Sequence, residues 1–328
     1  MQILMSQAAH ARVREPLAAL GEDLDVVTFD VDGVARRDGV VFDRATIDPE
    51  VFWLSLDLLR FDQAPRYFQQ ILGGARGKWA QVFAAGLDNP AFTRIMAKGL
   101  RLTKSSAQAA AIAEYVMCNA LSLLNPIAER RKAQARHEWR FVPFREIGST
   151  RWLIVGFGAI GHEIARRLRP FGAHLTVARR NVALEEGVDE VRPVSELAEM
   201  LPNADVVVLA CALNEDTRDL AGAAFFAAMK PGALLVNIAR GALIDEDALK
   251  AGLDRDQPAM VVLDVFRTEP LPADSWLWAH PKVRVSGHCS NAGDGVLARG
   301  DALFLENLRR YRAGEPLLNE ARPSEVGL

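Results

Sequence analysis

The sequence predicts an α/β protein built from two doubly wound domains. From Trp152 onward, short apolar runs alternate with helical patterns, and the runs lack the polar alternation of strands that face water on one side. The N-terminal third of the chain shows a smaller version of the same alternation. A chain of 328 residues is long enough for two hydrophobic cores. We therefore expect two mostly parallel sheets, each covered by helices on both faces.

Six apolar runs are the expected strands of the larger domain: residues 152–155, 174–178, 205–211, 233–239, 260–266 and 283–287. Helical patterns lie between them at residues 195–201, 221–229 and 245–253, and a further one follows the first run, with Ile160, Ile164 and Leu168 on one face. Parallel strands joined by helices form βαβ units, and two sets of such units make a doubly wound sheet.

The smaller domain is expected to combine the two ends of the chain. Its expected strands are residues 2–5, 26–29 and 79–84, and its expected helices are residues 13–20 and 64–72. Residues 107–124 form a long apolar helix pattern, and the charged run 129–140 indicates a connector that reaches to Thr150. The amphipathic tail 303–311 is expected to return to the smaller domain. We therefore place the domains at residues 1–104 with 293–328, and at residues 105–292.

Composition excludes several classes of partner. The formal net charge of −3 argues against nucleic acid or an anionic membrane as the main partner. Cys118, Cys211 and Cys289 are scattered and odd in number, which is typical of reduced thiols and not of a disulfide framework or a zinc site. The N-terminus lacks the apolar core of a secretory signal, and no run approaches the roughly 18 apolar residues of a membrane span. These observations predict a cytoplasmic protein with no metal.

A glycine-rich turn lies between the strand 152–155 and the helical pattern that follows it. It reads Gly156-Phe157-Gly158-Ala159-Ile160-Gly161. In such a turn the first glycine allows a tight bend, the second lets the backbone approach a pyrophosphate, and the third allows close packing of helix on strand. The helix N-terminus then offers unpaired N–H groups to the anion. The strand–turn–helix context predicts a Rossmann-type dinucleotide site.

The residues after the next expected strand indicate which dinucleotide is bound. An acid that binds the ribose 2′-hydroxyl usually stands at this position, but the chain has Ala178, Arg179 and Arg180. A guanidinium group cannot accept a hydrogen bond from a hydroxyl, whereas paired guanidinium groups suit a 2′-phosphate. The sequence therefore predicts that NADP(H) is preferred over NAD(H).

Three residues with complementary chemistry follow expected strands. Arg240, Glu269 and His288 come after the runs that end at residues 239, 266 and 287, and ligands bind at the carboxyl ends of parallel strands. Arginine can hold a carboxylate bidentately and polarise a neighbouring carbonyl. Histidine can transfer a proton near neutral pH, and an adjacent carboxylate keeps it charged and oriented. His280 precedes the strand 283–287 and is therefore expected at the opposite edge.

Four stretches together resemble one known family. They are VGFGAIG (155–161), VNIARGALIDEDAL (236–249), LDVFRTEPLP (263–272) and the run from Pro281 to His288, with weaker matches at FAAGLDN (83–89) and AEYV (113–116). This pattern resembles the D-isomer-specific 2-hydroxyacid dehydrogenases, in particular glyoxylate/hydroxypyruvate reductases of the NADP type. Cys289-Ser290-Asn291 departs from the commoner Ile-Ala-Gly, and the N-terminal third matches poorly.

The resemblance implies a role for each matching residue. Arg240 resembles the substrate-binding arginine, Glu269 the partner of the catalytic histidine, and His288 the acid/base. Asp264 resembles a residue that contacts the nicotinamide carboxamide, and the backbone at Ala85 and Gly86 resembles the loop that holds the substrate carboxylate. The expected cofactor-binding residues are Gly156, Gly158, Ala159, Ile160, Gly161, Arg179, Arg180, Ala239 and Asp264. The smaller domain would be a flavodoxin-like substrate domain, and the protein a homodimer.

These residues predict an NADP(H)-dependent oxidoreductase that interconverts a 2-keto acid and a (D)-2-hydroxy acid. Two alternatives remain open from the sequence. Formate dehydrogenases share the scaffold but usually have Gln where Glu269 stands. Corepressors that resemble this family use the fold as a nucleotide-sensing binding module and can retain all three site residues.

Overall fold

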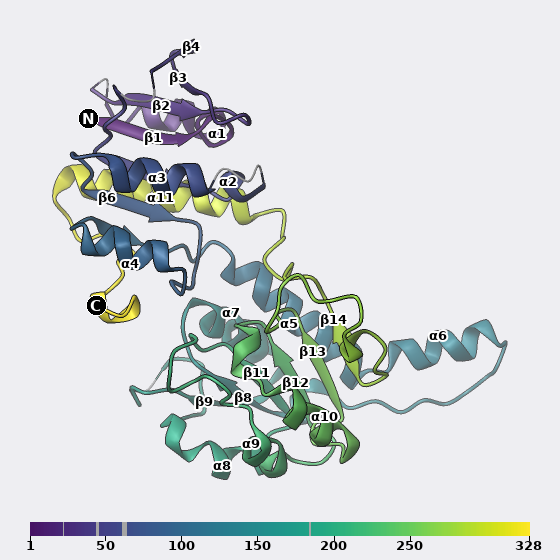
Figure 1. Cartoon of the computed structure of the whole chain (residues 1–328). Helices are drawn as coiled ribbons and strands as arrows, with labels where there is room; N and C mark the ends of the chain where they lie inside the picture. The colour runs from purple at the N-terminus through teal and green to yellow at the C-terminus, as the bar shows by residue number, and fades with distance from the viewer. Residues whose placement is uncertain (22, 44–45, 61–63, 184) are drawn as a thin grey trace. The chain divides into compact units, whose positions relative to one another are not determined.

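The computed structural model describes residues 1–21, 23–43, 46–60, 64–183 and 185–328 (Figure 1). It divides into two compact units. Unit 1 comprises Met1–Gln108 and Asp294–Leu328, and unit 2 comprises Ala109–Gly293. The division falls at residue 108, where the sequence suggested 104, and at residue 294, where it suggested 293.

Unit 2 is built on a seven-stranded sheet in the order β10-β9-β8-β11-β12-β13-β14. All neighbouring strands are parallel. The strands are β8 (Arg151–Val155), β9 (His174–Ala178), β10 (Glu190–Arg192), β11 (Val206–Leu209), β12 (Leu234–Asn237), β13 (Met260–Leu263) and β14 (Val283–Val285). Numbered by their order along the chain, the strands lie in the order 3-2-1-4-5-6-7. This is the 3-2-1-4-5-6 order of Rossmann-type sheets, which we expected, with a seventh strand at the edge. The sequence prediction included every strand except β10.

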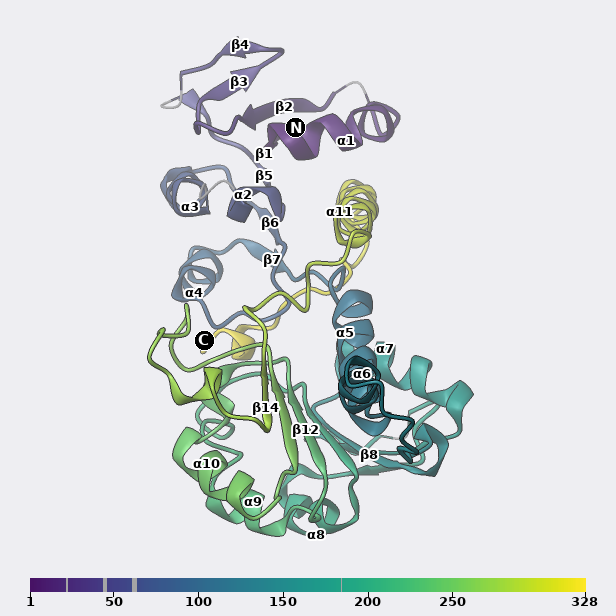
Figure 2. The ribbon, with the colours of Figure 1, turned by 90° about the vertical axis from the view of Figure 1, so that its right-hand side faces the viewer.

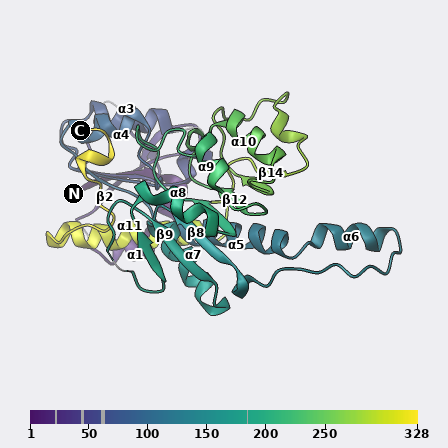
Figure 3. The same ribbon diagram turned by 90° about the horizontal axis from the view of Figure 1, so that it is seen from below.

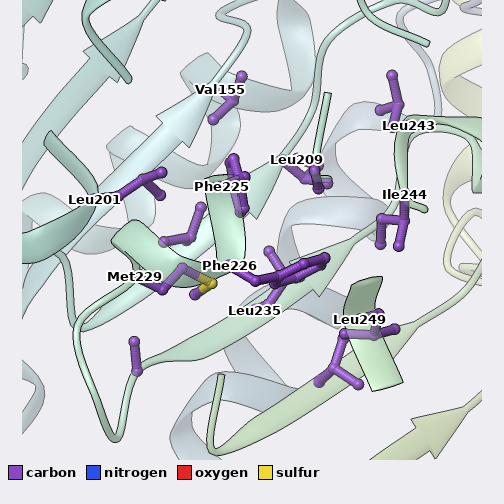
Figure 4. Close-up of a cluster of buried hydrophobic side chains, with 14 of the residues drawn as sticks. Val155, Leu201, Leu209, Phe225, Phe226, Met229, Leu235, Leu243, Ile244 and Leu249 are labelled. Atoms are coloured by element: carbon purple, nitrogen blue, oxygen red, sulfur yellow. The ribbon is translucent and has the colours of Figure 1, made fainter. Parts of the chain in front are cut away.

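Helices cover both faces of this sheet (Figure 2). One face carries α5 (Ala109–Leu124) and α7 (Ala159–Leu168), and the other carries α8 (Leu197–Met200), α9 (Ala223–Ala228) and α10 (Glu246–Asp254). Alternate residues of one strand enter different cores: Trp152 and Ile154 pack with α5 and α7, while Leu153 and Val155 pack with the other helices. Figure 4 shows the second core, with Phe225 and Phe226 of α9 at its centre. Burial on both faces explains why the strands read as unbroken apolar runs.

The charged run that the sequence suggested as a connector begins with a helix. α6 (Ile127–Ala135) follows α5, and an extended segment then runs from residue 136 to 146. Figures 1 and 3 show α6 and this segment extending away from the sheet of unit 2. Trp139 and Phe141 are 104% and 91% exposed. We call residues 127–146 the arm. Among the described helices none alone is long and apolar enough to cross a membrane, although α5 and α6, bent by 55°, reach that length and composition as a pair.

Unit 1 contains a second seven-stranded sheet, in the order β4-β3-β2-β1-β5-β6-β7. Its strands are β1 (Gln2–Ser6), β2 (Asp25–Phe29), β3 (Ala35–Arg37), β4 (Val40–Val41), β5 (Val51–Leu54), β6 (Trp79–Val82) and β7 (Arg101–Thr103). The parallel part follows the 2-1-3-4-5 order of flavodoxin-like sheets, as expected. An antiparallel hairpin of β3 and β4 extends one edge. The sequence prediction missed β3, β4, β5 and β7.

The C-terminal helix completes unit 1, as the sequence predicted. α1 (Gln7–Ala18) and α11 (Val296–Ala313) cover one face, and α3 (Ala64–Gly73) and α4 (Pro90–Ala97) cover the other (Figure 2). The ring of Phe304 stacks on Trp53 at 4.2 Å between centroids and on Trp79 at 5.8 Å. Short helical turns connect the remaining segments: α2 (Asp57–Arg60), η2 (Ile147–Ser149), η3 (Arg169–Phe171), η4 (Val194–Glu196), η5 (Leu201–Asn203), η6 (Gly241–Leu243), η7 (Trp276–Trp278) and η8 (Pro323–Glu325).

Replacing Phe304 with Ala is expected to destabilise unit 1 by about 3–5 kcal/mol, because a fully buried ring leaves a cavity between two tryptophans. Urea unfolding followed by tryptophan fluorescence measures this change. Arg312→Ala, at an exposed position on the same helix, should cost less than about 1 kcal/mol. Equal losses in the two variants would contradict the packing role of Phe304.

Candidate functional site

The glycine-rich turn connects β8 to α7, and each of its glycines has a different environment. Gly156 has a φ of +90°, and a Cβ there would lie 2.5 Å from the Cα of Cys211, so only glycine fits. A Cβ at Gly158 would meet nothing within 4 Å, so the space beside this residue is open. At Gly161 a Cβ would meet the ring of Phe157 at 2.7 Å. The third glycine therefore makes room for a side chain of the turn itself.

The N-terminus of α7 offers hydrogen-bond donors to an anion. The helix begins after Gly158, and no side chain caps it. The first N–H groups of a helix have no acceptor within the helix, and the helix dipole favours negative charge at this end. Ala159, Ile160 and Gly161 provide these groups. The turn and its open side therefore fit the pyrophosphate of a dinucleotide.

Arg179 and Arg180 directly follow β9, as the sequence indicated. The Arg179 guanidinium donates from Nε to the carbonyl of Asn181 and from Nη1 to the carboxylate of Glu185. Its side chain is 17% exposed. Arg180 is exposed and makes no ion pair with any residue that the structure describes. The two arginines are therefore adjacent in sequence but differ in environment, because only Arg179 is paired with an acid.

The turns that follow β12, β13 and β14 are hydrogen-bonded in series. The N–H of Asp264 donates to the carbonyl of Asn237 at 3.1 Å, and the N–H of His288 donates to the carbonyl of Asp264 at 2.8 Å. Parallel strands end at the same edge of a sheet, so these bonds extend the pairing of the strands into the turns. Arg240, Glu269 and His288 belong to these three neighbouring turns, as predicted.

A buried amide shapes the turn that carries Arg240. Asn237 is fully buried; its Nδ2 donates to the carbonyl of Arg240 at 2.9 Å and its Oδ1 accepts from the N–H of Ala239 at 3.1 Å. A Cβ at Gly241 would lie 1.9 Å from the carbonyl carbon of Phe266, so this turn lies directly against the backbone that leads to Glu269. The half-buried Arg240 donates from Nη1 to the carbonyl of Ala239 at 2.7 Å.

Glu269 and His288 form an ion pair. Nδ1 of His288 lies 2.8 Å from Oε2 of Glu269, while Oε1 of Glu269 accepts from the N–H of Phe266 at 2.9 Å. The carboxylate is therefore fixed at both oxygens. The imidazole side chain is 44% exposed, which leaves its Nε2 available to a ligand. His280 is not part of this arrangement, because its Nδ1 accepts from the N–H of Lys282.

Asp264 holds the turn that contains His288. Its carboxylate is completely buried and accepts from the N–H of Cys289 at 2.9 Å, the N–H of Ser290 at 3.0 Å and the hydroxyl of Ser286 at 2.6 Å. His288 itself has a φ of +50°, a left-handed conformation that is unfavourable for a residue with a side chain. Backbone N–H groups on both sides of one carboxylate stabilise that conformation. The expected contact of Asp264 with a cofactor is not among these interactions and stays a prediction.

Tyr115 of α5 extends this network. Its hydroxyl lies 2.5 Å from Oγ of Ser286, which in turn donates to Asp264. Burial raises the pKa of the Tyr115 phenol, so the hydroxyl keeps its proton. The tyrosine comes from the AEYV stretch, whose role the sequence did not indicate. The chain of bonds from Tyr115 through Ser286 to Asp264 connects a core helix to the His288 turn.

Ala85 and Gly86 lie in unit 1, in the loop that follows β6. The carbonyl of the preceding Ala84 accepts from the N–H of Ser105 at 3.0 Å, and the carbonyl of Phe83 accepts from the side chain of Gln108. The loop therefore starts at the carboxyl end of a parallel strand, where ligands bind in such sheets.

Among the described residues of both units, no group of three or more His, Cys, Asp or Glu side chains could hold a metal ion.

Replacing Asp264 with Asn should destabilise unit 2 by about 1–3 kcal/mol, because the amide places a donor opposite one of the two N–H groups. Hydrogen exchange at the amides of Cys289 and Ser290 should become faster. The exposed Asp274 provides a control, since Asp274→Asn should change neither quantity. Unchanged exchange at both amides in Asp264→Asn would contradict the role assigned to this carboxylate.

Comparisons with known proteins place this geometry in a family. A family model described as D-isomer specific 2-hydroxyacid dehydrogenase, NAD binding domain, matches residues 117–290, which is more than half of the chain. Glyoxylate/hydroxypyruvate reductase A of Serratia proteamaculans is 29% identical over 65% of this chain and 71% of its own length. Glyoxylate reductase of Thermococcus gammatolerans is 35% identical over 57% of this chain. This match covers about half of that relative's own length (55%).

A solved structure gives a match over the whole chain. It is a D-isomer specific 2-hydroxyacid dehydrogenase from Xanthobacter autotrophicus Py2, in complex with NADPH and MES, with a TM-score of 0.80 and 26% identity over 99% of both chains. The family match covers the glycine-rich turn and the three turns that carry Arg240, Glu269 and His288. The chain belongs to the D-isomer specific 2-hydroxyacid dehydrogenase family.

Proposed function

We propose that this protein is an NADP(H)-dependent reductase that converts a 2-keto acid into a (D)-2-hydroxy acid, and that it also catalyses the reverse reaction. One observation carries the proposal: the ion pair of Glu269 and His288, at 2.8 Å, belongs to turns that are hydrogen-bonded to the turn of Arg240. A carboxylate-binding guanidinium beside a proton-donating imidazole is the combination that reduction of a 2-keto acid requires.

Each of the three side chains has a separate role in this proposal. Arg240 binds the substrate carboxylate and polarises the adjacent keto oxygen. His288 donates a proton from Nε2 to the alkoxide that develops on this oxygen. Glu269 accepts a hydrogen bond from Nδ1, which fixes the ring and stabilises its positive charge. A bound nicotinamide cofactor would supply the hydride. We assign the backbone at Ala85 and Gly86 to the substrate carboxylate as well, on the basis of the family resemblance.

Several observations support a nicotinamide dinucleotide as the cofactor, and two of them favour NADP(H). Gly156, Gly158 and the first turn of α7 fit a pyrophosphate, and Ala239 and Asp264 are proposed to line the nicotinamide end. Arg179 and Arg180 offer positive charge where NAD-binding members of such folds carry an acid. The similar structure from Xanthobacter autotrophicus Py2 contains NADPH.

Cys118, Cys211 and Cys289 are unpaired, which supports the expected location in the cytoplasm.

Neither alternative function is favoured. Formate dehydrogenases usually have a neutral Gln as the partner of the histidine, whereas this chain has Glu269 at that position. The corepressor reading requires only nucleotide binding. The relatives from Serratia proteamaculans and Thermococcus gammatolerans are reductases named for glyoxylate and hydroxypyruvate, which supports short 2-keto acids as the substrate class.

The test measures NADPH oxidation with glyoxylate, hydroxypyruvate and longer 2-keto acids. Turnover with at least one of them is expected, and His288→Asn should lower kcat by about 10²–10⁴-fold while the Kd of NADPH stays unchanged. His280→Asn is the matched control and should keep full activity. Nucleotide binding without turnover of any keto acid would favour the binding module, and full activity of His288→Asn would refute the assigned role.

We also propose that the protein is a homodimer, and that the arm contributes to its interface. The arm extends away from the sheet of unit 2 (Figure 3), and its side chains Trp139 and Phe141 are almost fully exposed. Large exposed aromatic side chains of this kind are enriched at protein interfaces. Sedimentation equilibrium should give twice the chain mass of 36.0 kDa. The double variant Trp139→Ala, Phe141→Ala should shift the equilibrium toward the monomer, whereas Phe171→Ala, which removes another exposed ring, should not. A native monomer would exclude the dimer.

A further inference from the structure

The carboxylate of Glu185 pairs with Arg179, one of the two arginines that are proposed to favour a 2′-phosphate. Oε1 of Glu185 accepts from Nη1 of Arg179, and Oε2 lies 3.8 Å from Nε2 of His162. His162 belongs to the first turns of α7, and its ring packs edge-on against Phe157 of the glycine-rich turn at 4.3 Å. Glu185 therefore connects the end of β9 to the N-terminal part of α7, which are the two elements that hold a dinucleotide in this fold.

This arrangement leaves Arg179 with part of its donors already used. A guanidinium has five N–H donors, and two of them are committed to Glu185 and to the carbonyl of Asn181. The Glu185 side chain is 26% exposed, so its negative charge is only partly screened by water. A 2′-phosphate that approaches Arg179 would add about two negative charges next to this carboxylate. The carboxylate of Glu185 therefore repels the 2′-phosphate that the guanidinium of Arg179 attracts.

We propose that Glu185 sets the cofactor selectivity of this site, because its carboxylate replaces the acid that is absent from the end of β9. The proposal rests on the dinucleotide site proposed above. With a free ribose, the carboxylate accepts a hydrogen bond from the 2′-hydroxyl. With a 2′-phosphate, it competes for the guanidinium of Arg179 and repels the anion. Both effects lower the preference for NADP(H), so the site accepts NAD(H) as well and the arginine pair does not act alone.

The direction of a charge-removing substitution follows from both effects. Glu185→Gln keeps the size of the side chain but removes the repulsion, so binding of a 2′-phosphate should become tighter. The amide oxygen accepts a weaker hydrogen bond than a carboxylate, so binding of a free ribose should stay the same or weaken. The neighbouring Glu186 provides a matched control, because its side chain is 91% exposed and pairs with Arg169 at 3.1 Å, away from Arg179.

The experiment is isothermal titration calorimetry of the full chain with 2′,5′-ADP and with 5′-AMP, which differ in the 2′-phosphate and require no turnover. Glu185→Gln should raise the ratio of the two affinities by about tenfold in favour of 2′,5′-ADP, a typical effect of one partly screened charge pair. Glu186→Gln should leave the ratio unchanged. Arg179→Asp should lower the ratio, and Glu185→Gln should still raise it when it is added to Arg179→Ala, because the carboxylate repels the 2′-phosphate with or without the arginine.

The outcomes separate this inference from the proposed function. Binding of 2′,5′-ADP by the native chain with an unchanged ratio in Glu185→Gln would overturn the role of Glu185 and leave the NADP site standing. Equal changes in Glu185→Gln and Glu186→Gln would also overturn it, because any nearby charge would then suffice. Failure of the native chain to bind either nucleotide would refute both the dinucleotide site and the inference. Circular dichroism of each variant verifies that it is folded.

Discussion

The candidate site depends on one constraint, that all strands of the unit 2 sheet run in the same direction. Their carboxyl ends therefore lie along one edge, and hydrogen bonds from Asp264 to Asn237 and from His288 to Asp264 continue the sheet into the turns. The buried carboxylate of Asp264 then fixes the backbone on either side of Cys289. Glu269 and His288 are therefore positioned by hydrogen bonds within the protein, and a site positioned in this way needs less reorganisation when it binds a ligand.

Apart from β10, the strands of unit 2, which are buried on both faces, could be predicted from the sequence. Several elements that are short or exposed could not. The strands of unit 2 are covered on both faces and appear as unbroken apolar runs. β3 and β4 form an exposed hairpin with two arginines, and β7 has only three residues, so neither gives a clear pattern. Most residues of α6 belong to the charged run that predicts a connector. In the structure only Ala133 of this helix is buried, so no apolar periodicity marks it. β5 is an apolar run of four that the sequence prediction passed over.

The same distinction holds for the site. Arg240, Glu269 and His288 could be predicted because each follows a strand and has an ionisable side chain. Asn237 could have been found as well, since a polar side chain within an apolar strand is costly to bury without partners. Tyr115 and Ser286 could not, because their contact joins residues 171 positions apart and only the packing of α5 on the sheet brings them together. The pairing of Arg179 with Glu185 depends on a loop and gave no pattern.

The structure of the protein with NADP and oxamate, an analogue of a 2-keto acid that cannot be reduced, would show whether the three turns form the substrate site. We expect the pyrophosphate at the N–H groups of Ala159 to Gly161, the oxamate carboxylate on the guanidinium of Arg240, and the amide oxygen within hydrogen-bond distance of Nε2 of His288. The pair of Glu269 and His288 should keep its present geometry. An oxamate bound away from Arg240, or a His288 that turns from Glu269 to another partner, would refute the roles proposed for these residues.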